Sequence, residues 1–151
     1  MGSMFYVRLC VLLALLGLSG AEGWAGGVAS AATTSKADLC RQDHYQEFLE
    51  AFAEDLEFQK QHTKVPLLSV KYEYDFPDAK KIETALDFPK IEFPVFPSAE
   101  RRREKSLEIK FKPSAGGMSV QVSKPDTDYQ ITYFFERHQC WELVRMENVS
   151  L

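Results

Sequence analysis

Three histidines are the side chains of this sequence best suited to bind a transition metal or to shuttle a proton, and they lie far apart at His44, His62 and His138. A zinc site needs several ligands at short, regular spacings, because one turn or helix face must bring two of them to the same ion. No HxxxH, HExxH or CxxC pattern occurs in the sequence. We therefore expect no metal site, and solvated histidines at the two ends of a helix and in a turn.

The sequence also lacks the motifs of serine hydrolases, P-loop enzymes and dinucleotide-binding domains. This predicts no cofactor and favours a non-catalytic protein, while the question of enzymatic activity stays open. The 22 acidic and 18 basic residues give a net charge of −4, which disfavours nucleic-acid binding. The basic cluster Arg101-Arg102-Arg103 with Lys105 is flanked by glutamates, so we interpret it as a solvated turn.

The first residues have the pattern of a cleavable secretory signal peptide. Arg8 precedes an unbroken apolar run at 9–18, which is about half the length that a helix needs to span a bilayer. Small residues at 29–31 suit a signal peptidase, which predicts a mature chain that begins at Ala32, with a cut near Ala21 as the alternative. We therefore expect an exported bacterial protein, periplasmic or extracellular, with no stable membrane anchor.

The predicted organisation is a signal peptide at 1–31, a flexible leader at 32–39 and one α+β domain at 40–151. Cys10 would leave with the signal peptide, so Cys40 and Cys140 remain as an even pair in an oxidising compartment. We expect them to form a disulfide between the start of the first helix and the last strand. The alternative is two separate buried thiols.

An amphipathic helix of about 18 residues is expected to open the domain. It begins with a capping-box pattern, in which Asp43 is followed by Gln46 and Glu47. Its apolar positions recur every three or four residues: Tyr45, Phe48, Leu49, Phe52 and Leu56. This stripe predicts core packing of one helix face against a sheet.

The remainder of the chain predicts strands. Pro66 is expected to end the helical region, and alternation then predicts a half-buried strand at 68–74. The Phe-Pro dipeptides that follow predict an irregular segment with a short helix at 78–86 and an edge strand at 90–95. Alternating apolar residues after Ser98 predict an antiparallel meander with strands near 107–111, 118–122, 129–135 and 140–146. A helix followed by such a meander is an α+β domain.

Several features together resemble the nuclear-transport-factor-2-like superfamily: a helix ending in Phe58-Gln59, a mixed middle and an aromatic final hairpin at 133–145. Within it, Phe48, Phe52, Asp55, Phe58-Gln59 and Pro66-Leu67 are similar to exported bacterial domains of unknown function. The resemblance covers about residues 40–150. It implies an N-terminal amphipathic helix packed on a curved antiparallel sheet, a cone with a central pocket, and no defined activity.

Such a pocket implies two functions. The first is a non-catalytic module whose aromatic side chains receive a small apolar ligand or a protein partner: Tyr72, Tyr133, Phe135 and Trp141. The second is a small isomerase, dehydratase or hydrolase that uses a buried carboxylate as a base, for which Asp55 and Glu136 are the nearest candidates. An apolar pocket would favour binding, and a buried acid would favour catalysis. Pairing of two copies through the exposed sheet stays open.

Overall fold

The computed structural model describes these residues: Ser35, 38–75, 78–114 and 116–150. The predicted signal peptide at 1–31, Cys10 within it and the predicted mature start at Ala32 lie outside the described residues. None of the described helices has the length and apolar character needed to cross a membrane.

Helices open the described chain, and strands dominate the remainder. The first elements are η1 (Asp38–Cys40), η2 (Gln42–His44), α1 (Tyr45–Glu54) and α2 (Leu56–Gln61). A strand hairpin and a further 3-10 helix follow: β1 (Thr63–Asp75), β2 (Asp78–Leu86) and η3 (Phe88–Lys90). The last elements are α3 (Ala99–Lys105), β3 (Glu108–Ser114), β4 (Gly117–Ser123), β5 (Gln130–Arg137) and β6 (Trp141–Asn148).

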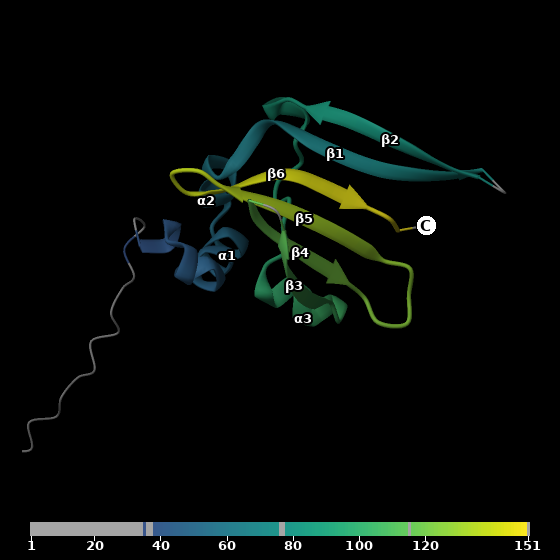
Figure 1. Ribbon diagram of the computed structural model, residues 1–151. Coiled ribbons are helices and arrows are strands. Elements are labelled where there is room, and N and C mark those ends of the chain that lie inside the picture. Colours follow the sequence, from purple (N-terminus) through teal and green to yellow (C-terminus); the bar gives the residue numbers. More distant parts are fainter. Residues whose placement is uncertain (1–34, 36–37, 76–77, 115, 151) are drawn as a thin grey trace, which may run out of the picture. The chain divides into compact units, whose positions relative to one another are not determined.

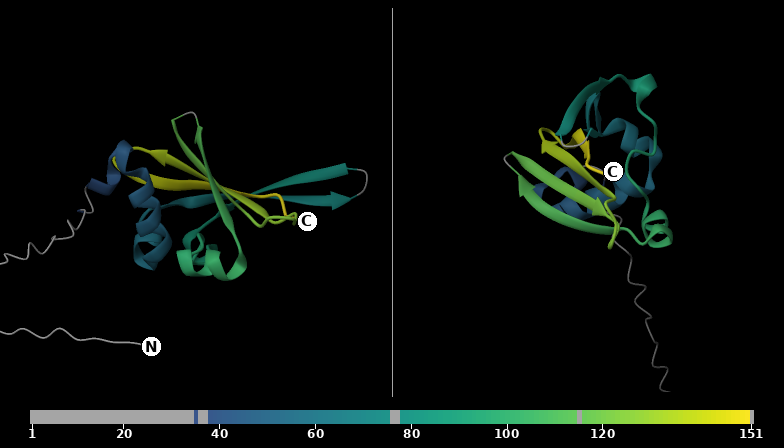
Figure 2. Two further views of the ribbon diagram at one scale, coloured as in Figure 1. Left: turned by 90° about the horizontal axis from the view of Figure 1, so that it is seen from below. Right: turned by 90° about the vertical axis from the view of Figure 1, so that its right-hand side faces the viewer.

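The strands form one curved, open sheet in the order β2-β1-β6-β5-β4-β3. Neighbouring strands are antiparallel except β1 and β6, which run parallel. Figures 1 and 2 show the helices and the segment between η3 and α3 on the inner, concave side of this sheet. The predicted α+β class, with N-terminal helical structure packed on a curved sheet, is confirmed. The parallel pair is a departure from the expected meander.

The single helix expected at the start of the domain is divided in two at Asp55. This residue has an extended backbone, with φ −111° and ψ 109°. Its Oδ1 accepts hydrogen bonds from the N–H groups of Glu57 and Phe58 at 2.9 and 3.0 Å. A carboxylate in this position satisfies the free donors at a helix start, so the chain begins α2 afresh. Leu56, expected in the apolar stripe, is consequently 44% exposed.

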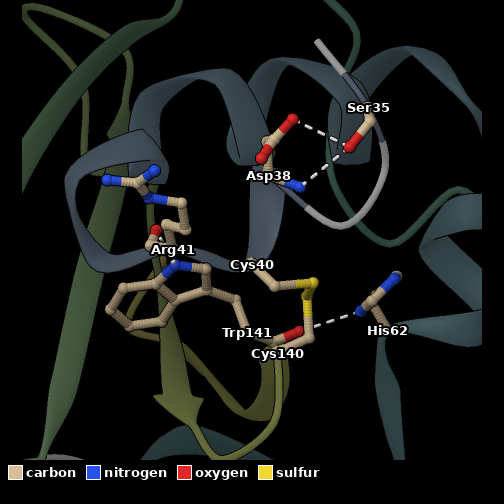
Figure 3. The surroundings of a disulfide bond; sticks show 7 residues. All are labelled: Ser35, Asp38, Cys40, Arg41, His62, Cys140 and Trp141. Carbon is tan, nitrogen blue, oxygen red and sulfur yellow. Dashed lines mark hydrogen bonds between the residues drawn. A yellow bond between two sulfur atoms is a disulfide. The ribbon is translucent and has the colours of Figure 1, made fainter.

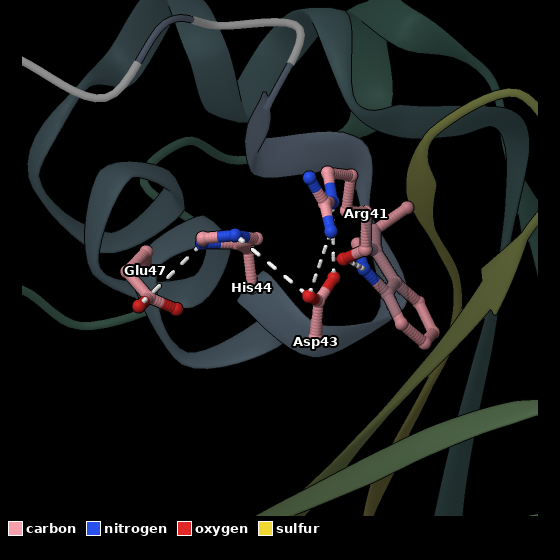
Figure 4. A network of polar contacts seen from close by, with 5 residues as sticks. Arg41, Asp43, His44 and Glu47 are labelled. Atoms are coloured by element: carbon pink, nitrogen blue, oxygen red, sulfur yellow. Dashed lines mark hydrogen bonds and ion pairs between the residues drawn. The ribbon is translucent and has the colours of Figure 1, made fainter.

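The capping box predicted at Asp43 does not form. Asp43 lies in η2 and pairs with Arg41 at 3.0 Å, and the hydrogen bond from that guanidinium holds the pKa of Asp43 below its ordinary value. The ring of His44, which precedes α1, lies between Asp43 and Glu47 with contacts of 4.0 and 3.7 Å (Figure 4). The start of α1 is therefore bordered by a charged surface network and has no side-chain cap.

Residues 78–86 were expected to be helical, and they form strand β2. The whole of β2 pairs with β1, from Asp78 beside Asp75 to Leu86 beside Leu67. Backbone pairing with an adjacent strand thus overrides a composition of alanine, lysine and glutamate that favours helix. The edge strand predicted at 90–95 is also wrong, because the chain there forms the end of η3 and an irregular connection to α3.

Strand β1 begins at Thr63, five residues before the predicted start. Its register with β6 shifts between Thr63 and Leu68. Pro66 lies in this interval and has no N–H to give to a ladder, so the irregularity accommodates it without ending the strand. Beyond Lys71, which lies beside Asn148, the end of β1 pairs only with β2 among the described strands.

An aromatic cluster attaches the helices to the inner face of the sheet. Phe48 of α1 packs against Phe58 of α2 and Phe135 of β5, with ring centroids 5.4 and 6.1 Å apart. Phe52 contacts Phe135 at 5.3 Å and Phe96 at 6.1 Å. Each ring is buried, and burial of one such side chain contributes about 1.5 to 3 kcal/mol. The predicted core face of the helix is confirmed for all its aromatic positions.

A disulfide joins Cys40 at the end of η1 to Cys140 just before β6 (Figure 3). The two residues are 100 positions apart in sequence, and their Cα atoms are 4.3 Å apart. Beside the bond, the Trp141 carbonyl accepts from Nδ1 of His62 at 3.0 Å, and the Trp141 indole donates to the Arg41 carbonyl at 3.4 Å. The structure thus contains the pairing that the sequence predicted.

The described fold includes residues that precede the predicted domain boundary at residue 40. Asp38 starts η1, and its carboxylate accepts a hydrogen bond from the Ser35 hydroxyl at 2.8 Å. Leu39 is buried and packs in the core. The last residues of the expected flexible leader therefore belong to the folded domain.

Tyr45, at the start of α1, has a buried hydroxyl with no hydrogen-bond partner among the described residues. Burial raises the pKa of this phenol far above its ordinary value. The ring packs against Trp141 and Phe135, at centroid distances of 4.8 and 6.2 Å. A buried polar group without a partner is unfavourable, so the ring stabilises the core while its hydroxyl opposes that gain.

We expect Tyr45→Phe to raise the free energy of unfolding by about 0.5 to 1.5 kcal/mol, because the ring stays and the unpartnered hydroxyl goes. Urea denaturation followed by tryptophan fluorescence measures this change. Tyr74→Phe is the matched control, since Tyr74 is exposed and its substitution should change stability by less than about 0.5 kcal/mol. A clear loss of stability in Tyr45→Phe would contradict the expectation.

Candidate functional site

Two cavities lie side by side on the inner face of the sheet. Their volumes are about 500 and about 420 Å³. Both are lined by Pro94 and Val95 from the connection between η3 and α3, and by Ile131 and Tyr133 from β5. We name the larger the Lys124 cavity and the smaller the Ser69 cavity, each after a lining residue that the other lacks.

The wall that the two cavities share is held in place by Gln59 of α2. Gln59 is buried, with 1% of its surface exposed to solvent. Its Nε2 donates to the Phe96 carbonyl at 3.0 Å, and its Oε1 accepts from the N–H groups of Val95 and Phe96 at 2.8 and 3.3 Å. Residues 91–98, here called the connecting segment, are thereby fixed to α2, and their side of both cavities is set by one buried amide.

The Lys124 cavity has a mostly apolar wall and a charged margin. The apolar wall is made by Pro94, Val95, Pro97, Leu107, Tyr129, Ile131 and Tyr133. The charged lining residues are Arg101, Lys105, Lys124 and Asp128, all exposed. Arg101 and Lys105 lie one helical turn apart on α3, which puts them on one face of that helix. Lys124 follows β4 and Asp128 precedes β5, so two segments bring charge to one margin.

Helix α3 corrects the expectation of a solvated turn at the basic cluster. The Ser98 hydroxyl caps the helix by accepting from the N–H of Arg101 at 3.2 Å. Arg102 turns to the protein, where its guanidinium donates to the Pro97 carbonyl at 2.7 Å and lies 5.8 Å from the centre of the Phe96 ring. Burial lowers the pKa of Arg102. Arg102 therefore packs against the protein and holds α3 in place, whereas Arg101 lines the Lys124 cavity.

Tyr133 is the buried polar group of the cavity wall, with 2% of its surface exposed. Its ring packs against Phe96 at 4.8 Å. Burial raises the pKa of Tyr133 far above its ordinary value, the nearby Tyr129 adds to this, and the charge of Arg101 opposes it. The phenol is therefore neutral across the physiological pH range, and its hydroxyl can donate a hydrogen bond.

The Ser69 cavity is more polar than the Lys124 cavity. Ser69 and Lys71 of β1, Thr84 of β2 and Asn148 of β6 contribute to its lining. Ile82, Leu86, Ile91 and Met146 supply apolar surface between them. Val70, which lies between Ser69 and Lys71 on β1, is buried and also borders this cavity.

The four aromatic residues predicted to share a pocket are not brought together. Tyr133 alone among them lines the two cavities. Phe135 lies in the core under the helices, and Trp141 is buried beside the disulfide. Tyr72 is on the outer face, where its hydroxyl donates to Glu147 at 2.6 Å, a bond that raises the pKa of Tyr72.

Neither carboxylate considered as a base lines either cavity. Asp55 caps α2, as described above, and is exposed. Glu136 borders a separate hollow with Leu68 and Val144, and its carboxylate lies 3.5 Å from His138. Across the described ranges, no His, Cys, Asp or Glu side chains form a group of three able to share a metal ion.

A comparison with solved structures finds a protein of similar fold. The crystal structure of an NTF2-like protein from Bacteroides fragilis matches the chain with a TM-score of 0.50 and 22% sequence identity, over 70% of this chain and 46% of that one. The domain has a nuclear-transport-factor-2-like fold. The predicted resemblance is thereby confirmed for the fold, and this chain spans less than half the length of that protein. The sequence matches no family of known domains and no curated protein.

Two parts of the site were not predicted from the sequence. The first is the cationic margin, whose signal was the basic cluster at 101–105, and the second is Gln59, whose signal was the Phe58-Gln59 step. The basic cluster lies at the Lys124 cavity, and Gln59 contacts the connecting segment. Both neighbours are distant in sequence, so neither contact can be read from the local pattern. The Phe-Pro dipeptides did predict an irregular segment, and the buried Phe96 ring packs it against Phe52 and Tyr133.

Proposed function

We propose that this domain is a non-catalytic binding module that holds a small apolar ligand in the Lys124 cavity. The observation that carries the proposal is the cavity itself, with a volume of about 500 Å³ and a mostly apolar wall. Small-molecule sites usually have volumes of about 300 to 1,000 Å³ and a few polar groups set in apolar walls. Tyr133 and the charged margin supply those polar groups here.

The alternative, a pocket enzyme with a buried carboxylate, has less support. Apart from tyrosines, the buried polar residues among those described are Gln59, Thr63, Ser69 and Ser119, and none of them is a carboxylate or a histidine. A general base in such a pocket needs a carboxylate or histidine whose pKa is shifted toward neutrality. Asp128, at the margin of the Lys124 cavity, is exposed. The described residues therefore favour binding.

We also propose that the domain acts outside the cytoplasm. The disulfide between Cys40 and Cys140 supports this, because structural disulfides persist in oxidising compartments and are rare in the cytosol. The predicted signal peptide points to the same location. The two observations are independent, since one comes from the N-terminal sequence and the other from the fold.

We expect the purified protein to bind the neutral apolar dye N-phenyl-1-naphthylamine, with an increase in dye fluorescence. Val95→Trp should weaken this binding at least about fivefold, because Val95 lines both cavities and the larger ring fills space that the dye needs. Val144→Trp is the matched control, since Val144 is half-buried outside both cavities.

Amide chemical shifts locate the dye independently of the variants. Binding to the Lys124 cavity should move the resonances of Leu107, Tyr129 and Ile131, which line it. Absence of dye binding to the unmodified protein, or shifts confined to the outer face of the sheet, would contradict the proposed function.

A further inference from the structure

We propose that the Lys124 cavity selects an amphipathic monoanion, a compact aromatic or hydrocarbon body that carries one carboxylate. The acid would face Arg101, Lys105 and Lys124, and the body would lie against the wall that contains Tyr133. This inference rests on the proposed function, because it names the ligand class for the same cavity.

The charge of the margin is the first argument. Three cationic side chains and one carboxylate line this cavity, whereas the full chain has a net charge of −4. Within the described residues, no ion pair engages Arg101, Lys105 or Lys124, although four pairs between a Lys or Arg and a carboxylate occur elsewhere. Positive charge is therefore concentrated at the margin of this cavity, where the described residues leave it without an ion-pair partner.

The fixed geometry of the donors is the second argument. Arg101 and Lys105 are on one face of a capped helix, and α3 is joined to the core through Arg102 and Phe96. A guanidinium presents paired N–H donors that match the two oxygens of a carboxylate. Because the helix is anchored, binding does not have to order the backbone that carries these side chains.

The apolar wall and the charged margin of the Lys124 cavity suit the two parts of such a ligand. Tyr133 supplies a neutral hydroxyl and a buried ring, and Leu107 and Ile131 extend the apolar surface beside it. A ligand with an apolar body and one acid fits both parts at once. A wholly polar anion such as free phosphate would leave the apolar wall against water, and a neutral hydrocarbon would leave the cations unused.

Three naphthalene derivatives of nearly equal size test the proposal: 2-naphthoate, 2-naphthalenemethanol and 2-naphthylmethylamine. Calorimetric titration of the purified protein should give an affinity for the anion at least about fivefold higher than for the alcohol, with the amine the weakest. Amide shifts of Tyr129 and Ile131 confirm the location. The preference for the anion should diminish between about 20 mM and about 500 mM salt, because exposed charges are screened.

The double variant Arg101→Gln/Lys124→Gln should reduce the preference of anion over alcohol to within about twofold, because two of the three cations that would face the acid are removed. Lys80→Gln/Lys110→Gln is the matched control, because it changes the net charge equally at exposed positions on β2 and β3. A control that abolishes the preference as strongly as the cavity variant would overturn the inference.

The failure of this inference and the failure of the proposed function give different results. If the alcohol and the anion bind in the cavity equally well, the cavity binds apolar ligands without charge selection and only this inference is wrong. If none of the three compounds moves the amide resonances of the cavity, and the neutral dye does not bind, the proposed function is wrong as well.

Discussion

Replacing Cys40 and Cys140 together by serine should lower the free energy of unfolding by about 3 to 5 kcal/mol. The bond closes a loop of 100 residues, and in the chain-entropy model a loop of this length gives about 4.7 kcal/mol. It also ties η1 to the start of β6, where Trp141 packs on the first helix. Since small domains have a total stability of about 5 to 15 kcal/mol, the variant should lose a large fraction of its margin.

Urea denaturation in oxidising and reducing buffer provides the measurement and its control. The unmodified protein should lose stability on reduction, whereas the double serine variant should be equally stable in both buffers. Mass spectrometry without reduction should find the two cysteines joined. Two freely alkylated thiols in native protein, or equal stability of the variant and the oxidised protein, would show that the bond is absent or unimportant.

Replacing Gln59 by leucine should destabilise the domain by about 2 to 4 kcal/mol, even though the two side chains have similar volumes. Three hydrogen bonds to the connecting segment are lost, and the N–H of Phe96 and its carbonyl are left in the interior without them. Leaving a buried polar group unsatisfied costs about 1 to 3 kcal/mol. Because the connecting segment lines both cavities, affinity for an apolar dye should fall with stability.

Gln61→Leu is the matched control for this prediction, because Gln61 is on the same helix and exposed. Hydrogen exchange gives a local readout, in which the amides of Val95 and Phe96 should lose protection in Gln59→Leu at denaturant-free conditions. Gln59→Glu adds a second test, since a carboxylate can accept from both N–H groups but cannot donate to the Phe96 carbonyl. Protection unchanged in both variants would contradict the assigned role.

The sequence predicted the fold where periodicity and burial agree. Phe48 and Phe52 recur at helical spacing and Tyr133 and Phe135 at strand spacing, and all four are buried in the core. The prediction was wrong where pairing with a distant segment of the chain determined the structure. Residues 78–86 have helix-forming composition, but β1 lies alongside and pairs with them throughout. A local helix cap also escaped detection. The Asp55 carboxylate accepts from the N–H groups of Glu57 and Phe58 and divides a helix whose apolar spacing continues through it.

The candidate site was predicted less well than the fold, for a physical reason. Aromatic residues on facing elements were expected to surround one pocket, but Phe135 and Trp141 are used to attach the helices and the N-terminal segment. The cavity instead forms where packing is interrupted, beside prolines and at the ends of elements. Cations on a short helix become part of it only because the connecting segment turns α3 toward β5.

The parallel pairing of β1 with β6 fixes an order of events during synthesis. The chain emerges from its N-terminus, so the β1–β2 hairpin is complete about 60 residues before its inner neighbour exists. Until residue 148 has emerged, one long edge of β1 has no neighbouring strand and can pair with other chains. The domain therefore completes its six-stranded sheet only after β6 has been added between β1 and β5. A truncation that removes β6 would leave this edge of β1 without its inner neighbour.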